Sequence, residues 1–227
     1  MTIDDKDLLN SILASLNRID HIKPETIPDI DLYMDQVTTF MENNLAPAKR
    51  YPDDKVLTKT MINNYTKDGL LPPPEKKKYS KEHMLLLIFI YYFKNILCIN
   101  DLHHILDPLV EKYFSSEDDL NLTDIYNEVF SLEKDEVQYL AKDITKKFNR
   151  SKETFKDAPE EDRESLQVFS LICMLSFDTF VKKMIIEKMI DLERAKHAAQ
   201  EPSAKKSAKS KKNRNYSEQV GAEPRRP

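Results

Sequence analysis

The sequence has almost no glycine. Only Gly69 and Gly221 occur among its 227 residues, and tight β-hairpins depend on residues that adopt a positive φ angle, chiefly glycine and asparagine. Apolar residues recur instead at about 3.6-residue spacing along most of the chain, which is typical of amphipathic helices. The sequence therefore predicts an all-α fold, and it offers no glycine-rich loop for binding phosphate groups.

Cysteines and long apolar runs are also scarce. Two isolated cysteines, Cys98 and Cys173, form neither a disulfide framework nor a metal-binding motif. The most apolar run, from Met84 to Phe93, covers ten residues, about half of what a membrane span needs. The amino terminus begins acidic and amphipathic, unlike a signal peptide. We therefore expect a cytoplasmic protein with no membrane partner.

No group of residues indicates catalysis or metal binding. The carboxylates stand in runs that suit a solvated surface, and no nucleophile has an identifiable base. His103 and His104 are adjacent, so on a helix they do not face the same point, and we expect the histidines to be surface or capping residues. The sequence predicts neither an enzyme nor a bound metal or cofactor.

Positive charge is concentrated in two regions of a protein whose net charge is −4. Residues 55–81 contain seven lysines against two acidic residues, and residues 196–227 contain nine lysines and arginines against three acidic residues. The second region has almost nothing to bury and is predicted to be a disordered tail. A basic region within an acidic protein is typical of a protein that binds a polyanion.

Periodicity and capping residues divide the chain into helices and domains. The proposed domains are an amino-terminal amphipathic helix (1–28), a head (29–107), a helical dimerisation or effector region (108–195) and the basic tail (196–227). Helices are predicted at residues 4–19, 31–44, 58–68, 81–96, 100–107, 123–148 and 159–195.

The short helix at 58–68 has two clearly different faces. Met61, Ile62 and Tyr65 point one way, whereas a polar stripe of Thr60, Asn63, Asn64 and Lys67 lies on the other side, with Lys59 beside it. Asparagine bonds to adenine edges, lysine reaches guanine or phosphate, and a threonine methyl group can contact thymine. After Gly69 and three prolines, Lys76, Lys77 and Lys78 are expected on a loop, where they suit phosphate contacts.

These residues carry a family resemblance. The run from Thr58 to Leu71, with Tyr65 and Gly69-Leu70-Leu71-Pro72, and then Tyr79-Ser80 before an apolar helix, resembles the head of MerR-type transcriptional regulators. The resemblance implies a winged helix-turn-helix, a helical bundle with a long carboxy-terminal helix, and binding to double-stranded DNA. It implies these DNA-binding residues: Thr58, Lys59, Thr60, Asn63, Asn64, Lys67, Lys76, Lys77, Lys78 and Tyr79.

The sequence departs from the MerR pattern in three places. The turn from Leu45 to Lys55 is long, the three lysines stand where the family has Gly-Tyr-Arg at its wing tip, and arginines are absent from the recognition helix. The whole chain also resembles an uncharacterised bacterial family known as a domain of unknown function. A helical protein-interaction module with a degenerate head that does not bind DNA is therefore the alternative to a DNA-binding regulator.

Helix 159–195 has too many apolar residues for a helix with a single buried face. Either it packs within the chain on one side and against a second copy on the other, forming a homodimer, or it lies at the centre of one helical bundle. No residue pattern identifies a small-molecule effector.

Overall fold

The computed structural model describes residues 5–16, 21–116 and 120–200. The chain divides into two units, Met1–Lys183 and Met184–Pro227. Helices hold most of the described residues, and one sheet of two short strands occurs among them. This confirms the predicted all-α fold. The elements are α1 (Asp5–Leu16), η1 (Pro24–Thr26), β1 (Leu32–Tyr33), α2 (Met34–Leu45), η2 (Ala46–Ala48), α3 (Lys59–Asp68), β2 (Lys78–Tyr79), α4 (Lys81–Phe93), α5 (Ile99–Tyr113), α6 (Leu122–Ser131), α7 (Glu133–Lys152) and α8 (Glu160–Gln200).

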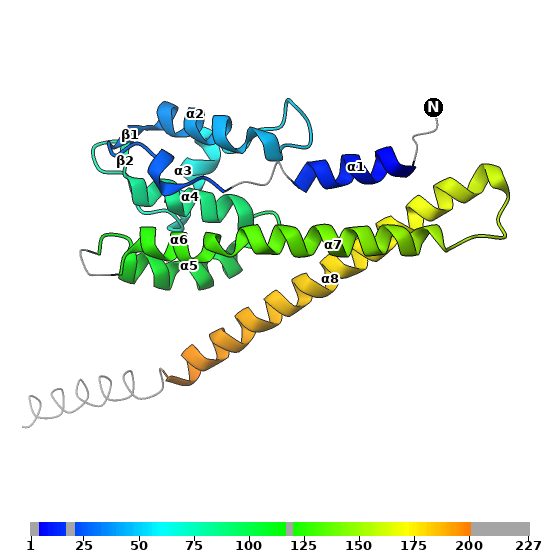
Figure 1. The fold of residues 1–227 in the computed structure, drawn as a ribbon. Helices are drawn as coiled ribbons and strands as arrows, with labels where there is room; N and C mark the ends of the chain where they lie inside the picture. Colours follow the sequence, from blue (N-terminus) through cyan, green and yellow to red (C-terminus); the bar gives the residue numbers. More distant parts are fainter. Residues whose placement is uncertain (1–4, 17–20, 117–119, 201–227) are drawn as a thin grey trace, which may run out of the picture. The chain divides into compact units, whose positions relative to one another are not determined.

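Helix α4 forms the core of the first unit (Figure 1). Every side chain from Met84 to Ile90 is at most 4% exposed, because a helix that is apolar on all sides is stable only when it is surrounded. The Phe89 ring lies 5.5 Å from the ring of Tyr126 in α6. The Tyr126 hydroxyl donates a hydrogen bond of 2.7 Å to the carbonyl of Ile22, so α6 also holds the segment that precedes η1.

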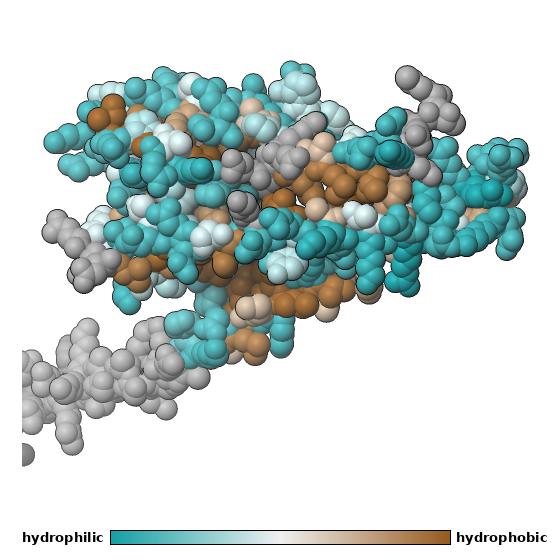
Figure 2. Space-filling view, viewed as in Figure 1, coloured by the Kyte–Doolittle hydropathy of each residue, from teal (hydrophilic) through white to brown (hydrophobic). Residues whose placement is uncertain are grey.

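Helix α2 packs against the sheet and against α3. Val37 and Met41 are fully buried, whereas the outer surface over α2 is mostly hydrophilic (Figure 2). The two strands pair antiparallel, with Leu32 opposite Tyr79 and Tyr33 opposite Lys78. The sheet therefore ties the start of α2 to the segment that follows α3.

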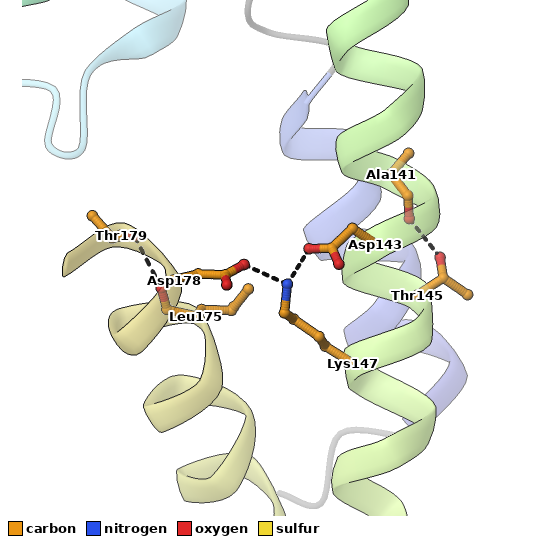
Figure 3. A network of polar contacts seen from close by, with 7 residues as sticks. All are labelled: Ala141, Asp143, Thr145, Lys147, Leu175, Asp178 and Thr179. Carbon is orange, nitrogen blue, oxygen red and sulfur yellow. Dashed lines mark hydrogen bonds and ion pairs between the residues drawn. The ribbon is translucent and has the colours of Figure 1, made fainter. Parts of the chain in front are cut away.

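Helix α7 packs on α1 and is joined to α8 by polar contacts. The Lys147 ammonium group lies between Asp143 on α7 and Asp178 on α8 and pairs with both (Figure 3). Gln167 on α8 donates hydrogen bonds to the carbonyls of Lys152 (3.0 Å) and Thr154 (3.1 Å). These contacts fix which side of α8 faces α7.

Three predicted helices differ from the structure. The segment 31–44 begins with strand β1, and 123–148 is two helices, because α6 packs on α4 whereas α7 packs on α1. The helix predicted to end before Pro108 continues through it to Tyr113. Packing beyond the proline explains this, since the ring of Phe114 lies 4.7 Å from that of the buried His83.

The second unit is described from Met184 to Gln200, as the continuation of α8. Its exposed apolar side chains include Met184, Ile185 and Met189. Most of the predicted disordered tail, residues 201–227, lies outside the described residues, as do residues 17–19 of the first predicted helix. None of the described helices is long and apolar enough to cross a membrane.

Candidate nucleic-acid interface

Helix α3 begins and ends at the residues that the sequence indicates. The Thr58 hydroxyl accepts a hydrogen bond of 3.1 Å from the Met61 amide, which satisfies one of the free N–H groups of the first turn. Gly69 follows the helix with φ of +89°, in the left-handed conformation that glycine adopts without steric cost. The chain then reverses into Leu70 and Leu71, which are both fully buried.

Burial on one side of α3 leaves its polar side outside. Ile62 is fully buried, and Leu57 next to the helix start is 4% exposed. These side chains anchor α3 to the core, so the opposite face lies on the surface. Five of the predicted contact residues are exposed there: Lys59, Thr60, Asn63, Asn64 and Lys67. Lys59 pairs with Asp35 of α2, and all five side chains remain exposed.

The lysine loop after α3 is a tight turn. The Lys78 amide donates to the Glu75 carbonyl at 2.8 Å, and Lys76 and Lys77 between them have φ angles of 50° and 66°. Positive φ at both central positions corresponds to a type I′ turn, which normally uses Asn-Gly. Two lysines therefore adopt a backbone conformation that is energetically unfavourable for residues other than glycine, and both side chains are exposed.

Two predicted contact residues have structural roles instead. Tyr79 was expected among the DNA-binding residues, but its side chain is 3% exposed and its ring lies 5.5 Å from that of His83. Strand pairing explains this, because alternate residues of a strand point to opposite sides, so Lys78 faces outward and Tyr79 inward. Thr58 is half-buried and its hydroxyl is used in the helix cap.

Lys78 is held beside the sheet. Its side chain is half-buried, and its ammonium nitrogen lies 5.3 Å from the centre of the Tyr33 ring on the paired strand. This cation–π contact directs the Lys78 side chain across β1. Lys76, which lies 4.0 Å from the Glu75 carboxylate, and Lys77 are therefore the two lysines that the turn exposes to solvent.

The long segment between α2 and α3 is held by two lysines. Lys49 pairs with Glu42 on α2, and this hydrogen bond lowers the pKa of Glu42 below its usual value. Lys94, after α4, donates from its ammonium group to the Val56 carbonyl at 2.9 Å. The segment that departs from the MerR pattern is therefore fastened to α2 and α4 immediately before the cap of α3.

His103 connects α3 with α5 and has no signal in the sequence. Its Nε2 atom lies 2.9 Å from the carboxylate of Asp68, the last residue of α3, and its Nδ1 atom lies 3.1 Å from Asp107. The hydrogen bond to Asp68 raises the pKa of His103, and Asp107 acts in the same direction. The contact with Asp68 spans 35 residues, so no local spacing could have indicated it.

His83 is a buried capping residue at the start of α4. Its Nδ1 atom accepts a hydrogen bond of 3.0 Å from the Ser80 amide, in agreement with the expectation of surface or capping histidines. Burial lowers the pKa of His83, although the carbonyls of Pro73 and Pro72 oppose the shift. Within the described part of the chain, no group of three His, Cys, Asp or Glu side chains could hold a metal ion.

Comparison with known protein families gives a match to part of the chain. Residues 22–129 match the model of a family described as a domain of unknown function (DUF1836). The matched segment includes the sheet, α2 to α5 and most of α6, and therefore the whole of the candidate interface. No curated protein and no solved structure matches the chain.

Proposed function

We propose that this protein is a DNA-binding transcriptional regulator. In this proposal α3 enters the major groove, and Lys76 and Lys77 contact phosphates at the flank. Its main support is that the polar face of α3 is exposed while the opposite face is buried. The turn that follows α3 also presents two exposed lysines. A helix fits the major groove of B-form DNA, where each base pair has its own pattern of donors and acceptors.

The residues of this face differ in whether they suit contacts with bases or with the phosphate backbone. The side-chain amides of Asn63 and Asn64 can each make two hydrogen bonds to an adenine edge, whereas the lysines suit phosphates or guanine. The proposal retains the winged helix-turn-helix head of the MerR resemblance, with α2 and α3 as the helical pair and the Glu75–Lys78 turn as the wing. It also includes a homodimer, because a two-fold protein reads two half-sites about 34 Å apart.

Selection of bound genomic fragments by the purified protein, followed by fluorescence anisotropy between about 50 and 200 mM salt, tests the proposal. Affinity should fall steeply over this range, since neutralised phosphates release counterions. Replacement of Asn63 and Asn64 by alanine should lose about 1–3 kcal/mol of preference per lost base contact. The matched control replaces two exposed asparagines on α6 and α7, Asn127 and Asn149, and should leave binding unchanged.

Two results would contradict the proposal. One is that no genomic fragment is enriched above random DNA. The other is that the α3 variant and the control variant bind equally well. A folded protein without DNA affinity would instead favour the helical interaction module.

A further inference from the structure

His103 of α5 contacts a carboxylate with each nitrogen of its ring. Its Nε2 atom lies 2.9 Å from Oδ2 of Asp68, the last residue of α3, and its Nδ1 atom lies 3.1 Å from Oδ1 of Asp107, one turn further along α5. A neutral imidazole has a single N–H group, whereas the protonated ring donates from both nitrogens. Both hydrogen bonds therefore exist together only when His103 carries a positive charge.

The three side chains of this cluster are within reach of solvent. The side chain of His103 is 25% exposed, that of Asp68 54% and that of Asp107 47%. The hydrogen bond to Asp68 raises the pKa of His103, partial burial of the ring opposes the shift, and Asp107 adds to it. His103 therefore keeps its positive charge to a higher pH than an ordinary histidine.

Charged groups from two helices face the His103 ring, Asp68 from α3 and Asp107 from α5 itself. The neighbouring His104 points about 100° away around α5, and Lys67 points away from Asp68 by the same angle around α3. His103 and the two carboxylates together therefore become more negative by one charge when the ring loses its proton.

Asp68 lies at the edge of the exposed polar face of α3. It follows Asn64 by four residues, so the two side chains are on the same side of the helix, one turn apart. A carboxylate at this position is unfavourable in two ways. The C-terminal end of a helix already carries partial negative charge, and DNA phosphates repel a negative group beside the face that they approach. A protonated His103 offsets both effects.

The same contact joins the end of α3 to a firmly packed helix. Leu102 and Leu106 of α5, on either side of His103 in the sequence, are each 1% exposed, so α5 is anchored in the core. At its other end α3 is joined to α2 by the ion pair between Lys59 and Asp35. Of these two contacts, the one through His103 is the one that titrates near neutral pH.

We propose that the proton on His103 regulates DNA binding. The charged ring bridges Asp68 and Asp107, holds the end of α3 and offsets the negative charge of Asp68, whereas the neutral ring leaves one carboxylate unbonded and weakens binding. This inference rests on the proposed DNA-binding function and names a regulator of the same site. Because nearby phosphates favour the charged ring, bound DNA retains the proton, and by linkage the DNA affinity falls as pH rises.

Fluorescence anisotropy with a selected genomic fragment at constant salt, at about pH 6.5 and about pH 8.5, tests the proposal. The wild type should bind about two- to fivefold more weakly at the higher pH, the size expected for an interaction between partly exposed charges. Asp68→Asn should lose most of this pH dependence and bind at the higher pH about as well as the wild type does at the lower one. His103→Gln, which is neutral throughout, should bind at both pH values as the wild type does at the higher one.

Two matched variants separate this cluster from other titrating groups. His104→Gln replaces the neighbouring histidine of α5 and should retain the pH dependence. Glu128→Gln removes an exposed carboxylate from α6 and should leave the affinity unchanged at both pH values. His83 stays neutral over the chosen range, because burial lowers its pKa. Circular dichroism at both pH values confirms that each variant is folded.

NMR titration of the histidine ring signals measures the cluster without DNA. The pKa of His103 should lie above about 6.5, the ordinary value, and should fall in the Asp68→Asn variant. A His103 pKa at or below the ordinary value, or one that Asp68→Asn leaves unchanged, would overturn the inference.

The DNA measurements distinguish failure of this inference from failure of the proposed function. If the wild type binds equally well at both pH values, or Asp68→Asn keeps the full pH dependence, the regulation is wrong. DNA binding still stands in that case, provided that replacement of Asn63 and Asn64 lowers the base preference. Absence of binding at both pH values contradicts the proposed function, and the regulatory inference then fails with it.

Discussion

We predict that the lysine turn after α3 lowers the stability of the fold and raises its affinity for DNA. Lys76 and Lys77 both have positive φ angles, and the left-handed conformation costs a non-glycine residue roughly 1–2 kcal/mol. Replacement by Asn and Gly, the pair that type I′ turns favour, should relieve most of this cost at both positions. The introduced glycine lowers the stability of the fold by about 0.5–1 kcal/mol, because it has greater conformational freedom in the unfolded chain. The net gain should be at least about 1 kcal/mol.

The same double variant should bind DNA less well, because two positive charges are gone. Each phosphate contact contributes about 0.9 to the slope of log affinity against log salt. Removal of two contacts should therefore lower that slope by about 1.8, so the fourfold change from 50 to 200 mM salt should weaken binding roughly tenfold less than in the wild type.

Thermal unfolding and anisotropy measure the two effects separately. For a chain of this size, about 1 kcal/mol corresponds to a rise in melting temperature of about 2–4 °C. The control replaces two exposed lysines of α7, Lys142 and Lys146, by alanine. It should change neither the melting temperature through the turn nor the slope of log DNA affinity against log salt. A double variant that is less stable than the wild type, or that keeps the full salt slope, would refute this reasoning.

Three further predictions concern residues that position the interface. Gly69→Ala should destabilise by about 1–2 kcal/mol in denaturant unfolding, entirely through its φ of +89°, because no atom lies within 4 Å of an added Cβ. The pKa of His103 is raised by its hydrogen bond to Asp68, so its stabilising contribution is complete below about pH 6.5, the unfolded value, and is lost as pH rises through the higher folded value. His103→Gln should therefore lower stability more at pH 6 than at pH 9. The pKa of His83 is lowered by burial, so the wild type should lose stability as pH falls below about 6.5, and His83→Gln, which retains a capping box with Ser80, should lose less.

The ends of the helices around the interface could be predicted from sequence because local residues determine them. Thr58 and Ser80 are capping residues and Gly69 is the glycine of a helix stop, so α3 and α4 begin close to their predicted positions. These features depend on neighbours within four residues.

Features that depend on distant partners could not be predicted in the same way. Two-residue strands are too short to show an alternating pattern, so the burial of Tyr79 depends on its pairing with Leu32, 47 residues earlier. Helix α5 continues through Pro108 because the residues beyond it pack on α4. The link from His103 to Asp68 likewise joins two helices whose contact no local spacing shows.

Photo-cross-linking from α3 tests the central claim most directly. A photoreactive amino acid at Asn63, on the exposed face of α3, should form a covalent bond with bases of a selected genomic fragment. The same amino acid at Tyr139, exposed on α7, should not. Cross-linking from Asn63 that disappears with excess unlabelled fragment would support α3 as the reading helix. No cross-link from Asn63, or equal cross-linking from the two positions, would contradict it.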